Sequence, residues 1–351
     1  MPKKIRVLVI DDSALIRQIL TKGLSMDPEI EVVGSAVDPY IARDKIVQLR
    51  PDVLTLDVEM PRMDGVEFLR KLMPQYPIPV VMVSSLTQRG KQITIEALEA
   101  GAVDFVSKPT SNVAQGMNNM LSELRKKVKT AAGANVSQWK NKAPAQPGAQ
   151  TSMSSRALAE STDKVIAIGA STGGTEALKK VVCKFPATAP GVVIVQHMPP
   201  GFTKMFAERL NQLCAMEVKE AETGDRVRSG RILIAPGAKQ LEVTRSGGMY
   251  QVRCEPGEKV SGHCPSVDVM MQSVAKNVGS NAIGVMLTGM GSDGSDGMLA
   301  MKNAGARNIA QDEASCVVFG MPKVAYEKGG AEKLVPLENI AAKVISMLTE
   351  K

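Results

Sequence analysis

The chain has 351 residues, of which 44% are apolar and 23% charged, and it is long enough for two or more globular domains. No apolar run approaches the roughly 18 residues that a membrane-spanning helix needs, and the N-terminal apolar run stops at Asp11, too early for a signal peptide. The net charge of +7 falls mostly on the middle of the chain, so we expect a cytoplasmic protein that neither inserts into a membrane nor binds nucleic acid.

Residues 4–121 alternate short β-branched runs with amphipathic segments. Five runs are predicted to be strands: 5–10, 31–34, 53–56, 80–83 and 104–106. Such near-continuous apolar runs are typical of a parallel sheet that is buried on both faces. The alternation of strands and helices predicts a five-stranded α/β domain of the doubly wound kind, with its chemistry at the carboxyl ends of the strands.

The periodicity is lost between residues 122 and 160, where Ala, Gly, Pro, Gln and Ser dominate. This composition predicts a flexible linker between two domains. Trp139, the only tryptophan, lies in this segment. We expect it to be incidental to the linker; a docking contact is the alternative, because tryptophan is enriched at binding hot spots.

Strand and helix patterns return in residues 161–351. The predicted strands are 165–168, 192–195, 232–235 and 283–287, and the predicted helices are 175–182, 202–212 and 267–278. Residues 243–245 and 250–253, joined by a serine and two glycines, predict an antiparallel hairpin. The second domain is therefore expected to be α/β, doubly wound and mostly parallel.

Charged side chains follow three of the strands predicted in the first domain. Asp11 and Asp12 follow the first strand, Asp57 the third and Lys108 the fifth. Because these strand ends converge on one edge of the sheet, the three carboxylates should repel one another unless a hard cation such as Mg²⁺ neutralises them. A carboxylate beside such a metal can accept a phosphoryl group, which a lysine can hold. A single Asp after a strand is more often a helix cap, so the prediction depends on the combination.

Residues 4–121 resemble a bacterial response-regulator receiver domain, and Leu56–Pro61 with Met63–Gly65 match its phosphorylation loop. The resemblance implies that a histidine kinase phosphorylates Asp57. It also implies roles for further residues: Asp12, Asp57 and the carbonyl of Glu59 as Mg²⁺ ligands, Asp11 acting through water, Ser84 and Phe105 as switch residues, and Lys108 as the phosphate contact. The peptide between Lys108 and Pro109 is expected to be cis, as it usually is in this family.

Gly169–Gly174 lies between a strand and a helix, and two interpretations of it compete. As a relative of G-x-G-x-x-G it could bind a phosphate at the helix N-terminus. As G-x-S-x-G it presents Ser171 as a nucleophile on a sharp turn. A dinucleotide site needs an acidic residue after the next strand, but the residue found there is His197. The pattern therefore favours a serine nucleophile with a histidine base.

Spacing alone leaves the third member of a catalytic triad open. Asp293 and Asp296 both follow a later strand in a glycine-rich segment. We expect one of them to orient His197 and the other to cap the helix that begins near Gly297. The second of the two histidines, His263, lies in a predicted loop and is expected to be a surface or cleft-lining residue.

Residues 161–351 resemble the catalytic domain of the chemotaxis protein-glutamate methylesterases, the CheB family. Four segments carry the resemblance: 169–174, 196–199, 263–268 and 288–294. Together, the two resemblances cover essentially the whole chain outside the linker. They imply Ser171 as nucleophile, His197 as base and Asp293 as orienting acid. Thr172 and Met290 fall at positions associated with the oxyanion hole, and no cofactor is expected in the esterase site.

The family resemblance also implies the reaction and its partners. The expected function is a phosphorylation-activated serine esterase that demethylates glutamate methyl esters on methyl-accepting chemotaxis receptors and deamidates specific receptor glutamines. A chemotaxis histidine kinase is the expected phosphodonor, and we expect a monomer. The alternative is a response regulator with a non-catalytic output domain. The triad and the near-neutral charge of residues 161–351 argue against that alternative.

Overall fold

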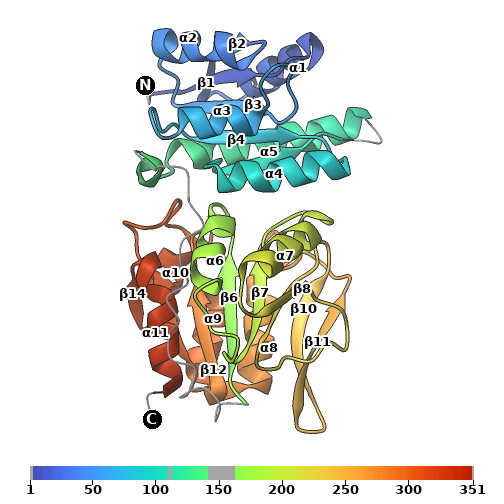
Figure 1. The fold of residues 1–351 in the computed structure, drawn as a ribbon, viewed down its shortest axis with the longest axis vertical. Coiled ribbons are helices and arrows are strands. Elements are labelled where there is room, and N and C mark those ends of the chain that lie inside the picture. The colour runs from blue at the N-terminus through green and yellow to red at the C-terminus, as the bar shows by residue number, and fades with distance from the viewer. Residues whose placement is uncertain (1–2, 110–112, 141–162, 350–351) are drawn as a thin grey trace. The chain divides into compact units, whose positions relative to one another are not determined.

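The structure, a computed structural model, describes residues 3–109, 113–140 and 163–349. The chain divides into two compact units, Met1–Pro147 and Gly148–Lys351, and each is described by itself (Figure 1). The predicted linker residues 141–160 lie outside the described residues. Within the described part, no helix has both the length and the apolar character needed to cross a membrane.

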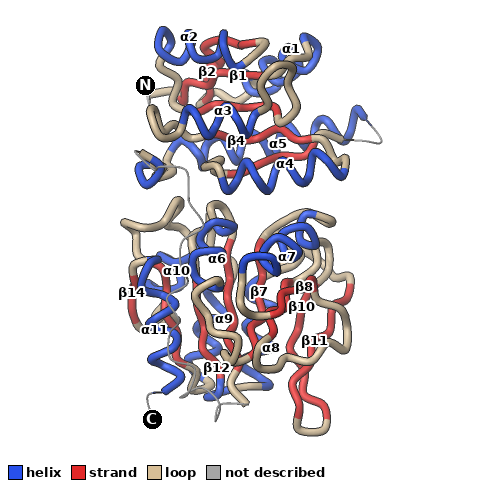
Figure 2. The backbone as a smooth tube through the Cα atoms, in the orientation of Figure 1, coloured by secondary structure: helices blue, strands red, loops and turns tan. Residues whose placement is uncertain are grey.

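The first unit is built on a five-stranded parallel sheet of order β2-β1-β3-β4-β5 (Figure 2). Its strands are Ile5–Ile10 (β1), Ile30–Ala36 (β2), Val53–Asp57 (β3), Val80–Ser84 (β4) and Asp104–Ser107 (β5). Its helices are Ala14–Ser25 (α1), Pro39–Leu49 (α2), Gly65–Leu72 (α3), Gln88–Glu99 (α4) and Val113–Ala132 (α5). Helix α1 packs with α5, and α3 packs with α4. The predicted parallel α/β architecture is confirmed.

The structure corrects the start of the predicted linker, because α5 continues through residue 121 to Ala132 and the short helix Ser137–Trp139 (η1) follows it. The buried positions of α5 recur at helical spacing: Leu121, Leu124, Val128 and Ala131. Trp139 is only 8% exposed, and its ring lies beside Gly101, where a Cβ atom would come within 3.0 Å of it. Trp139 therefore belongs to the core of the first unit and is not incidental to a linker.

The second unit contains a seven-stranded parallel sheet of order β14-β13-β12-β6-β7-β9-β8. Its strands are Val165–Ala170 (β6), Gly191–Gln196 (β7), Glu217–Glu220 (β8), Arg231–Ile234 (β9), Ala282–Met286 (β12), Arg307–Gln311 (β13) and Lys333–Val335 (β14). The predicted antiparallel hairpin is formed by Gln240–Ser246 (β10) and Met249–Glu255 (β11). The helices are Gly174–Val182 (α6), Phe202–Leu213 (α7), Val267–Asn277 (α8), Ser295–Asn303 (α9), Met321–Glu327 (α10) and Leu337–Thr349 (α11), with the short helix Gly279–Asn281 (η3).

The strand order of the second unit locates its site. From β6 the chain continues outward on one side through β7, and it later returns to the other side of β6 at β12. Parallel sheets bind ligands where the strand order reverses in this way, outside the carboxyl ends of the strands. Catalytic or binding residues are therefore expected in the segments that follow β6, β7 and β12.

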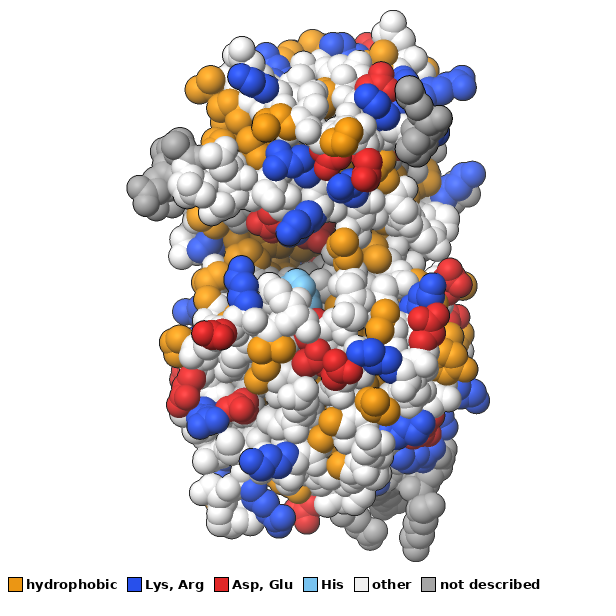
Figure 3. All heavy atoms as spheres, turned by 180° about the vertical axis from the view of Figure 1, so that it is seen from behind, with side chains coloured by type: hydrophobic (Ala, Val, Ile, Leu, Met, Phe, Trp, Pro, Cys, Tyr) orange, Lys and Arg blue, Asp and Glu red, His pale blue; other side chains and the backbone are white. Residues whose placement is uncertain are grey.

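Charged side chains on the surface are mixed in sign. Among the described residues on the face drawn in Figure 3, Lys and Arg are interspersed with Asp and Glu and form no continuous basic patch. Histidine atoms reach the surface on the same face. The chain has only two histidines, His197 and His263, so a substrate can reach at least one of them.

Replacing Trp139 with alanine should lower the free energy of unfolding of the first unit by about 3–5 kcal/mol, because it removes a large buried ring. Urea unfolding of the full chain, followed by circular dichroism, measures the effect. The exposed neighbour Lys140 is the matched control, and Lys140→Ala should change stability by no more than about 0.5 kcal/mol. If the Trp139→Ala chain were as stable as the wild type, Trp139 would not be part of the core and would have to be assigned to the linker.

Candidate functional site

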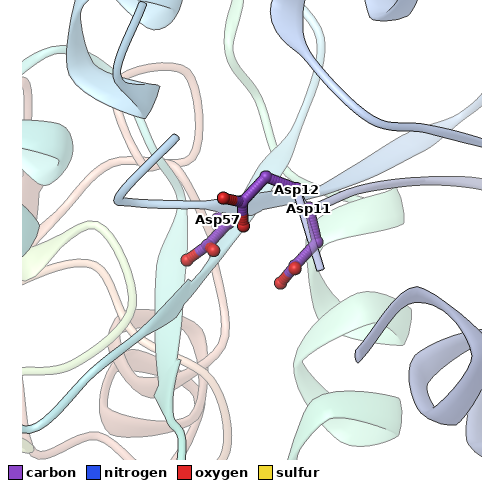
Figure 4. Close-up of side chains that lie close together, drawn as sticks. All are labelled: Asp11, Asp12 and Asp57. Atoms are coloured by element: carbon purple, nitrogen blue, oxygen red, sulfur yellow. The ribbon is translucent and has the colours of Figure 1, made fainter. Parts of the chain in front are cut away.

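Three carboxylates gather at the carboxyl edge of the sheet in the first unit. Asp11 and Asp12 follow β1, Asp57 ends β3, and oxygen atoms of all three lie within 4.8 Å of one another (Figure 4). The Lys108 Nζ atom is 3.0 Å from Asp11 Oδ2 and 2.9 Å from Asp57 Oδ2. Asp11 and Asp57 are buried, whereas Asp12 is exposed. The structure thus brings together the four charged residues that the sequence singled out.

Charge is not balanced in this cluster. Burial and the neighbouring Asp11, acting against the attraction of Lys108, raise the pKa of Asp57 to about 6. Burial opposes the charge of Lys108, but Asp57 and Asp11 outweigh that effect and raise the pKa of its ammonium group. A single ammonium group is thus shared between two buried carboxylates. An all-oxygen donor set with excess negative charge fits a hard divalent cation such as Mg²⁺.

The two predicted switch residues, Ser84 and Phe105, form hydrogen bonds with helices of the first unit. The Ser84 hydroxyl lies 2.5 Å from Thr94 Oγ1 and donates to the carbonyl oxygen of Gly90 at 3.2 Å, so it is bonded to α4 rather than to the carboxylates. Phe105 is buried on β5, and its carbonyl oxygen accepts a hydrogen bond from Lys127 of α5 at 2.5 Å. Both residues therefore connect a strand to a helix of the first unit.

The side chain of Glu59, whose carbonyl is the expected metal ligand, accepts a hydrogen bond from Ser85 Oγ at 3.3 Å. The prediction of a cis peptide between Lys108 and Pro109 is wrong: among the described residues, the cis peptide is Cys264–Pro265. The trans form is favoured by about 0.5–1 kcal/mol even before proline, and Lys108 reaches both carboxylates with it.

In the second unit, Ser171 and His197 directly follow two paired residues. Ala170 at the end of β6 is in register with Gln196 at the end of β7. The His197 N–H donates to the carbonyl oxygen of Ala170 at 3.2 Å. The Gln196 side-chain amide donates to the carbonyl oxygens of Ser171, at 3.0 Å, and of His197, at 3.3 Å. The nucleophile and the base are therefore tied together as neighbours on adjacent strands.

The turn that presents Ser171 depends on two glycines. Gly173 has a φ of 76°, in the left-handed region that favours glycine, and Gly174 N–H closes the turn by donating to Ser171 O at 2.7 Å. A Cβ atom on Gly174 would clash with the side-chain oxygen of Gln196. Helix α6 begins at Gly174, so Ser171 lies just before a helix N-terminus. This geometry is that of a nucleophile on a strand-to-helix turn.

The acid that binds His197 is Asp293. The His197 Nε2 atom lies 2.7 Å from Asp293 Oδ2. Asp293 also accepts hydrogen bonds from the start of α8: from Ser266 Oγ at 2.7 Å and from Val267 N–H at 2.7 Å. Burial opposes its charge, but His197, Ser266 and Val267 together lower the pKa of Asp293 to about 2. Asp293 is therefore ionised at neutral pH and fixes the proton of His197 on Nε2.

The choice that spacing left open is thereby decided. Asp296 is exposed, and its carboxylate lies 2.6 Å from Lys328 Nζ. It does not cap α9, because the helix begins at Ser295 and its N-cap is Gly294. The expected cap is therefore wrong, whereas the helix does begin near Gly297, two residues earlier at Ser295. Asp296 belongs to an exposed ion pair.

The second ring nitrogen of the base is the one that remains for Ser171. The Nδ1 atom of His197 is buried and, in the structure as described, has no hydrogen-bond partner. Because Nε2 is held by Asp293, Nδ1 is the atom that can take the Ser171 proton. Catalytic hydrogen bonds of this kind commonly tighten only when substrate binds.

Three further residues lie next to Ser171 or His197. Thr172 follows it directly, and its carbonyl oxygen accepts a hydrogen bond from Thr288 Oγ1 at 3.0 Å. Met290 follows Gly289, where a Cβ atom would come within 2.8 Å of Ser171 Cβ. His263, expected to be a surface or cleft-lining residue, stacks on His197 with ring centroids 3.6 Å apart. The only sequence signal for this contact was that the chain has just two histidines.

Both units of the chain match known protein families. Residues 166–344 match the family model described as CheB methylesterase, and residues 7–129 match that of the response regulator receiver domain. A protein-glutamate methylesterase/protein-glutamine glutaminase of Syntrophotalea carbinolica is 74% identical over 351 residues, which is 100% of this chain and 99% of that protein. A protein of the same name from Salmonella typhimurium is 53% identical over 346 residues, covering 99% of this chain and 97% of its own.

A solved structure resembles the second unit. The catalytic domain of the Thermotoga maritima CheB methylesterase is 40% identical, with a TM-score of 0.51. The match covers 52% of this chain and 98% of that domain.

Asp293→Asn should lower the turnover of a small chromogenic ester by about 10²- to 10⁴-fold, because an amide does not hold the base in the required tautomer. Asp296→Asn is the matched control, and it should leave turnover within about twofold, since it removes only an exposed ion pair. Steady-state kinetics on both full-length variants make the comparison. A larger loss in Asp296→Asn would move the third triad member to that position.

Proposed function

The chain belongs to the CheB methylesterase family, and from that premise we propose that it is a phosphorylation-controlled protein-glutamate methylesterase and protein-glutamine glutaminase. It hydrolyses glutamate γ-methyl esters on chemoreceptors and converts receptor glutamines to glutamate. The observation that carries this function is a 74% identity to a protein of that name along the whole chain. A serine beside a buried His197–Asp293 pair supplies chemistry that both reactions need.

The proposed mechanism is acyl transfer through Ser171. Its Oγ attacks the side-chain carbonyl carbon of the substrate while His197 Nδ1 takes the hydroxyl proton. The imidazolium then returns that proton to the leaving group, so methanol departs from an ester or ammonia from an amide. A water molecule, deprotonated by the same nitrogen, then attacks the acyl carbon. The proton passes to Ser171 Oγ as that bond breaks, and glutamate is released. Asp293 stays ionised and balances the positive charge of His197 in each half of the cycle.

The negative charge that develops on the substrate carbonyl oxygen needs a site next to Ser171. We assign it to the turn at Thr172 and the loop at Met290, both of which adjoin the serine. The N-terminus of α6 begins at the same turn, and its dipole favours negative charge there. Fixed donors of this kind supply a large share of the rate enhancement in acyl transfer.

The first unit contains the phosphorylation site that controls the esterase activity. Asp12, Asp57 and the carbonyl of Glu59, with Asp11 through water, would hold Mg²⁺, whose charge offsets that of the carboxylates and of a phosphoryl group. An Asp57 oxygen accepts the phosphoryl group of a kinase phosphohistidine, and Lys108 contacts the transferred group. Ser84 then exchanges its bond with Thr94 for one with the phosphoryl group. Phe105 responds on the neighbouring strand.

The partners follow from the two units. A receiver domain implies a kinase as phosphodonor, and a receptor methylesterase implies chemoreceptors as substrate. We propose that the kinase is the chemotaxis histidine kinase, that the receptors are the methyl-accepting kind, and that the enzyme acts as a monomer in the cytoplasm. A non-catalytic output domain is not favoured.

With Mg²⁺ and acetyl phosphate, the wild-type chain should gain the mass of one phosphoryl group, because the Asp57 carboxylate lies beside its cation-binding neighbours. Intact-mass spectrometry measures the label. Asp57→Asn should abolish it. The exposed Asp44 is the matched control, and Asp44→Asn should label as the wild type does. Persistent labelling of Asp57→Asn would move the phosphoacceptor elsewhere.

Ser171→Ala should reduce methanol release from methyl-labelled receptor membranes by at least about 10³-fold, since triad members act as a unit. His197→Ala should do the same. Deamidation should fall in parallel, because both reactions pass through the same acyl-enzyme. Ser246→Ala, at an exposed hairpin position, is the control and should behave as the wild type. Substantial turnover in folded Ser171→Ala would rule out the serine mechanism.

A further inference from the structure

The rings of His263 and His197 lie face to face. Their centroids are 3.6 Å apart, and the angle between their planes is 4°. Aromatic pairs that are not constrained by the surrounding chain prefer offset or edge-to-face arrangements, with centroids about 4.5–7 Å apart. A closer and nearly parallel pair is therefore held in place by the chain around it.

A tight turn holds His263. The Val260 N–H donates to His263 O at 3.0 Å, and the His263 N–H donates to Val260 O at 2.9 Å. The two residues between them, Ser261 and Gly262, have φ values of 52° and 83°. Two consecutive positive φ values inside a reciprocally bonded pair define a two-residue hairpin turn. The backbone of His263 is thus fixed before its side chain makes any contact.

The same segment holds the acid of the triad. Three residues after His263, the Ser266 hydroxyl donates to Asp293 Oδ1 at 2.7 Å, and the Val267 N–H donates to Asp293 Oδ2 at 2.7 Å. We call residues 260–268 the clamp segment. Through His263, the clamp segment contacts the ring face of His197, the base. Through Ser266 and Val267, it contacts Asp293, the acid that binds the ring edge of His197. One short stretch of chain therefore positions both members of the His197–Asp293 pair.

The imidazole of His197 needs a second restraint. Its Nε2 is bonded to Asp293, but its buried Nδ1 has no hydrogen-bond partner among the described residues. A ring held at one edge can still swing about that bond, and Nδ1 would then leave the line toward Ser171. A flat surface against the ring face blocks this motion.

We propose that His263 is a positioning residue for the catalytic base. Its ring holds the His197 imidazole in the plane in which Nε2–H meets Asp293 while Nδ1 is presented to Ser171. The inference rests on the proposed function for its kinetic consequence, but the orientation of the ring can be measured without any substrate. What His263 supplies is a flat ring, so another flat ring should replace it.

NMR of the imidazole rings tests how firmly the ring of His197 is held. The chain has two histidines, so the full-length protein labelled with ¹⁵N-histidine gives two ring spin systems, and His263→Phe assigns that of His197. In the wild type and in His263→Phe, His197 should be the tautomer protonated on Nε2 and should give sharp ring signals, because a flat ring holds it. In His263→Ala and in His263→Leu, which fills space without a flat face, Asp293 still keeps the proton on Nε2. We expect the ring signals of His197 to be broadened, because the ring can now swing about that bond.

Kinetics test the consequence. His263→Ala should lower kcat for a small ester by about 10- to 100-fold, the loss expected when a catalytic group is misplaced by about 1 Å, with KM little changed. His263→Phe should restore kcat to within a few fold of the wild type. Thermal unfolding checks each variant, and if the alanine variant does not fold, the comparison of His263→Phe with His263→Leu decides.

Two results would overturn the proposal. One is a folded His263→Ala enzyme with wild-type kcat and with His197 ring signals as sharp as those of the wild type. The other is a folded His263→Phe enzyme as slow as His263→Ala, which would mean that the ring nitrogens of His263 act and not its flat face. An inactive wild type would instead count against the proposed function, and the NMR comparison would still test the position of the ring.

Discussion

An ionised carboxylate that is only 2% exposed, Asp293, is the constraint on which the esterase unit depends. A buried charge is tolerated only when it is paired and hydrogen-bonded, because taking it out of water costs several kcal/mol. Its donors come from the segment after β7 and from the start of α8, so its own loop after β12 must meet both. Satisfying this one charge brings together the parts of the chain that form the catalytic site.

The first unit uses a buried aspartate in the opposite way. Asp57 has a raised pKa of about 6, because burial and Asp11 outweigh the single ammonium group of Lys108. Asp293 has more donors than it needs to stay charged, whereas Asp57 has fewer. The satisfied carboxylate is suited to a permanent structural and electrostatic role. The unsatisfied one is suited to gaining a cation and a phosphoryl group, which is what a switch requires.

Apolar periodicity predicted the elements in which the hydrophobic pattern is uninterrupted, such as β1 and β6. It missed β13, because the buried Asn308 and Gln311 interrupt the apolar run; there they bond to backbone N–H groups of Gly284 and Thr288. Motif reasoning found Ser171 and His197 from their strand-end positions. It could not separate Asp293 from Asp296, since only tertiary contacts with α8 distinguish them. It could not predict the His197–His263 stack either, because the two residues lie far apart in sequence.

Demethylation and deamidation make unequal demands on His197 as the catalytic base. An ester can expel its alcohol with modest help from a proton, but an amide nitrogen leaves only after it has received one. Deamidation therefore depends on the imidazolium delivering its proton along a fixed line, whereas demethylation tolerates more freedom. A His197 ring restrained at its edge by Asp293 and at its face by His263 meets the stricter demand. A single triad can then serve both substrates, because the geometry that the amide requires is more than sufficient for the ester.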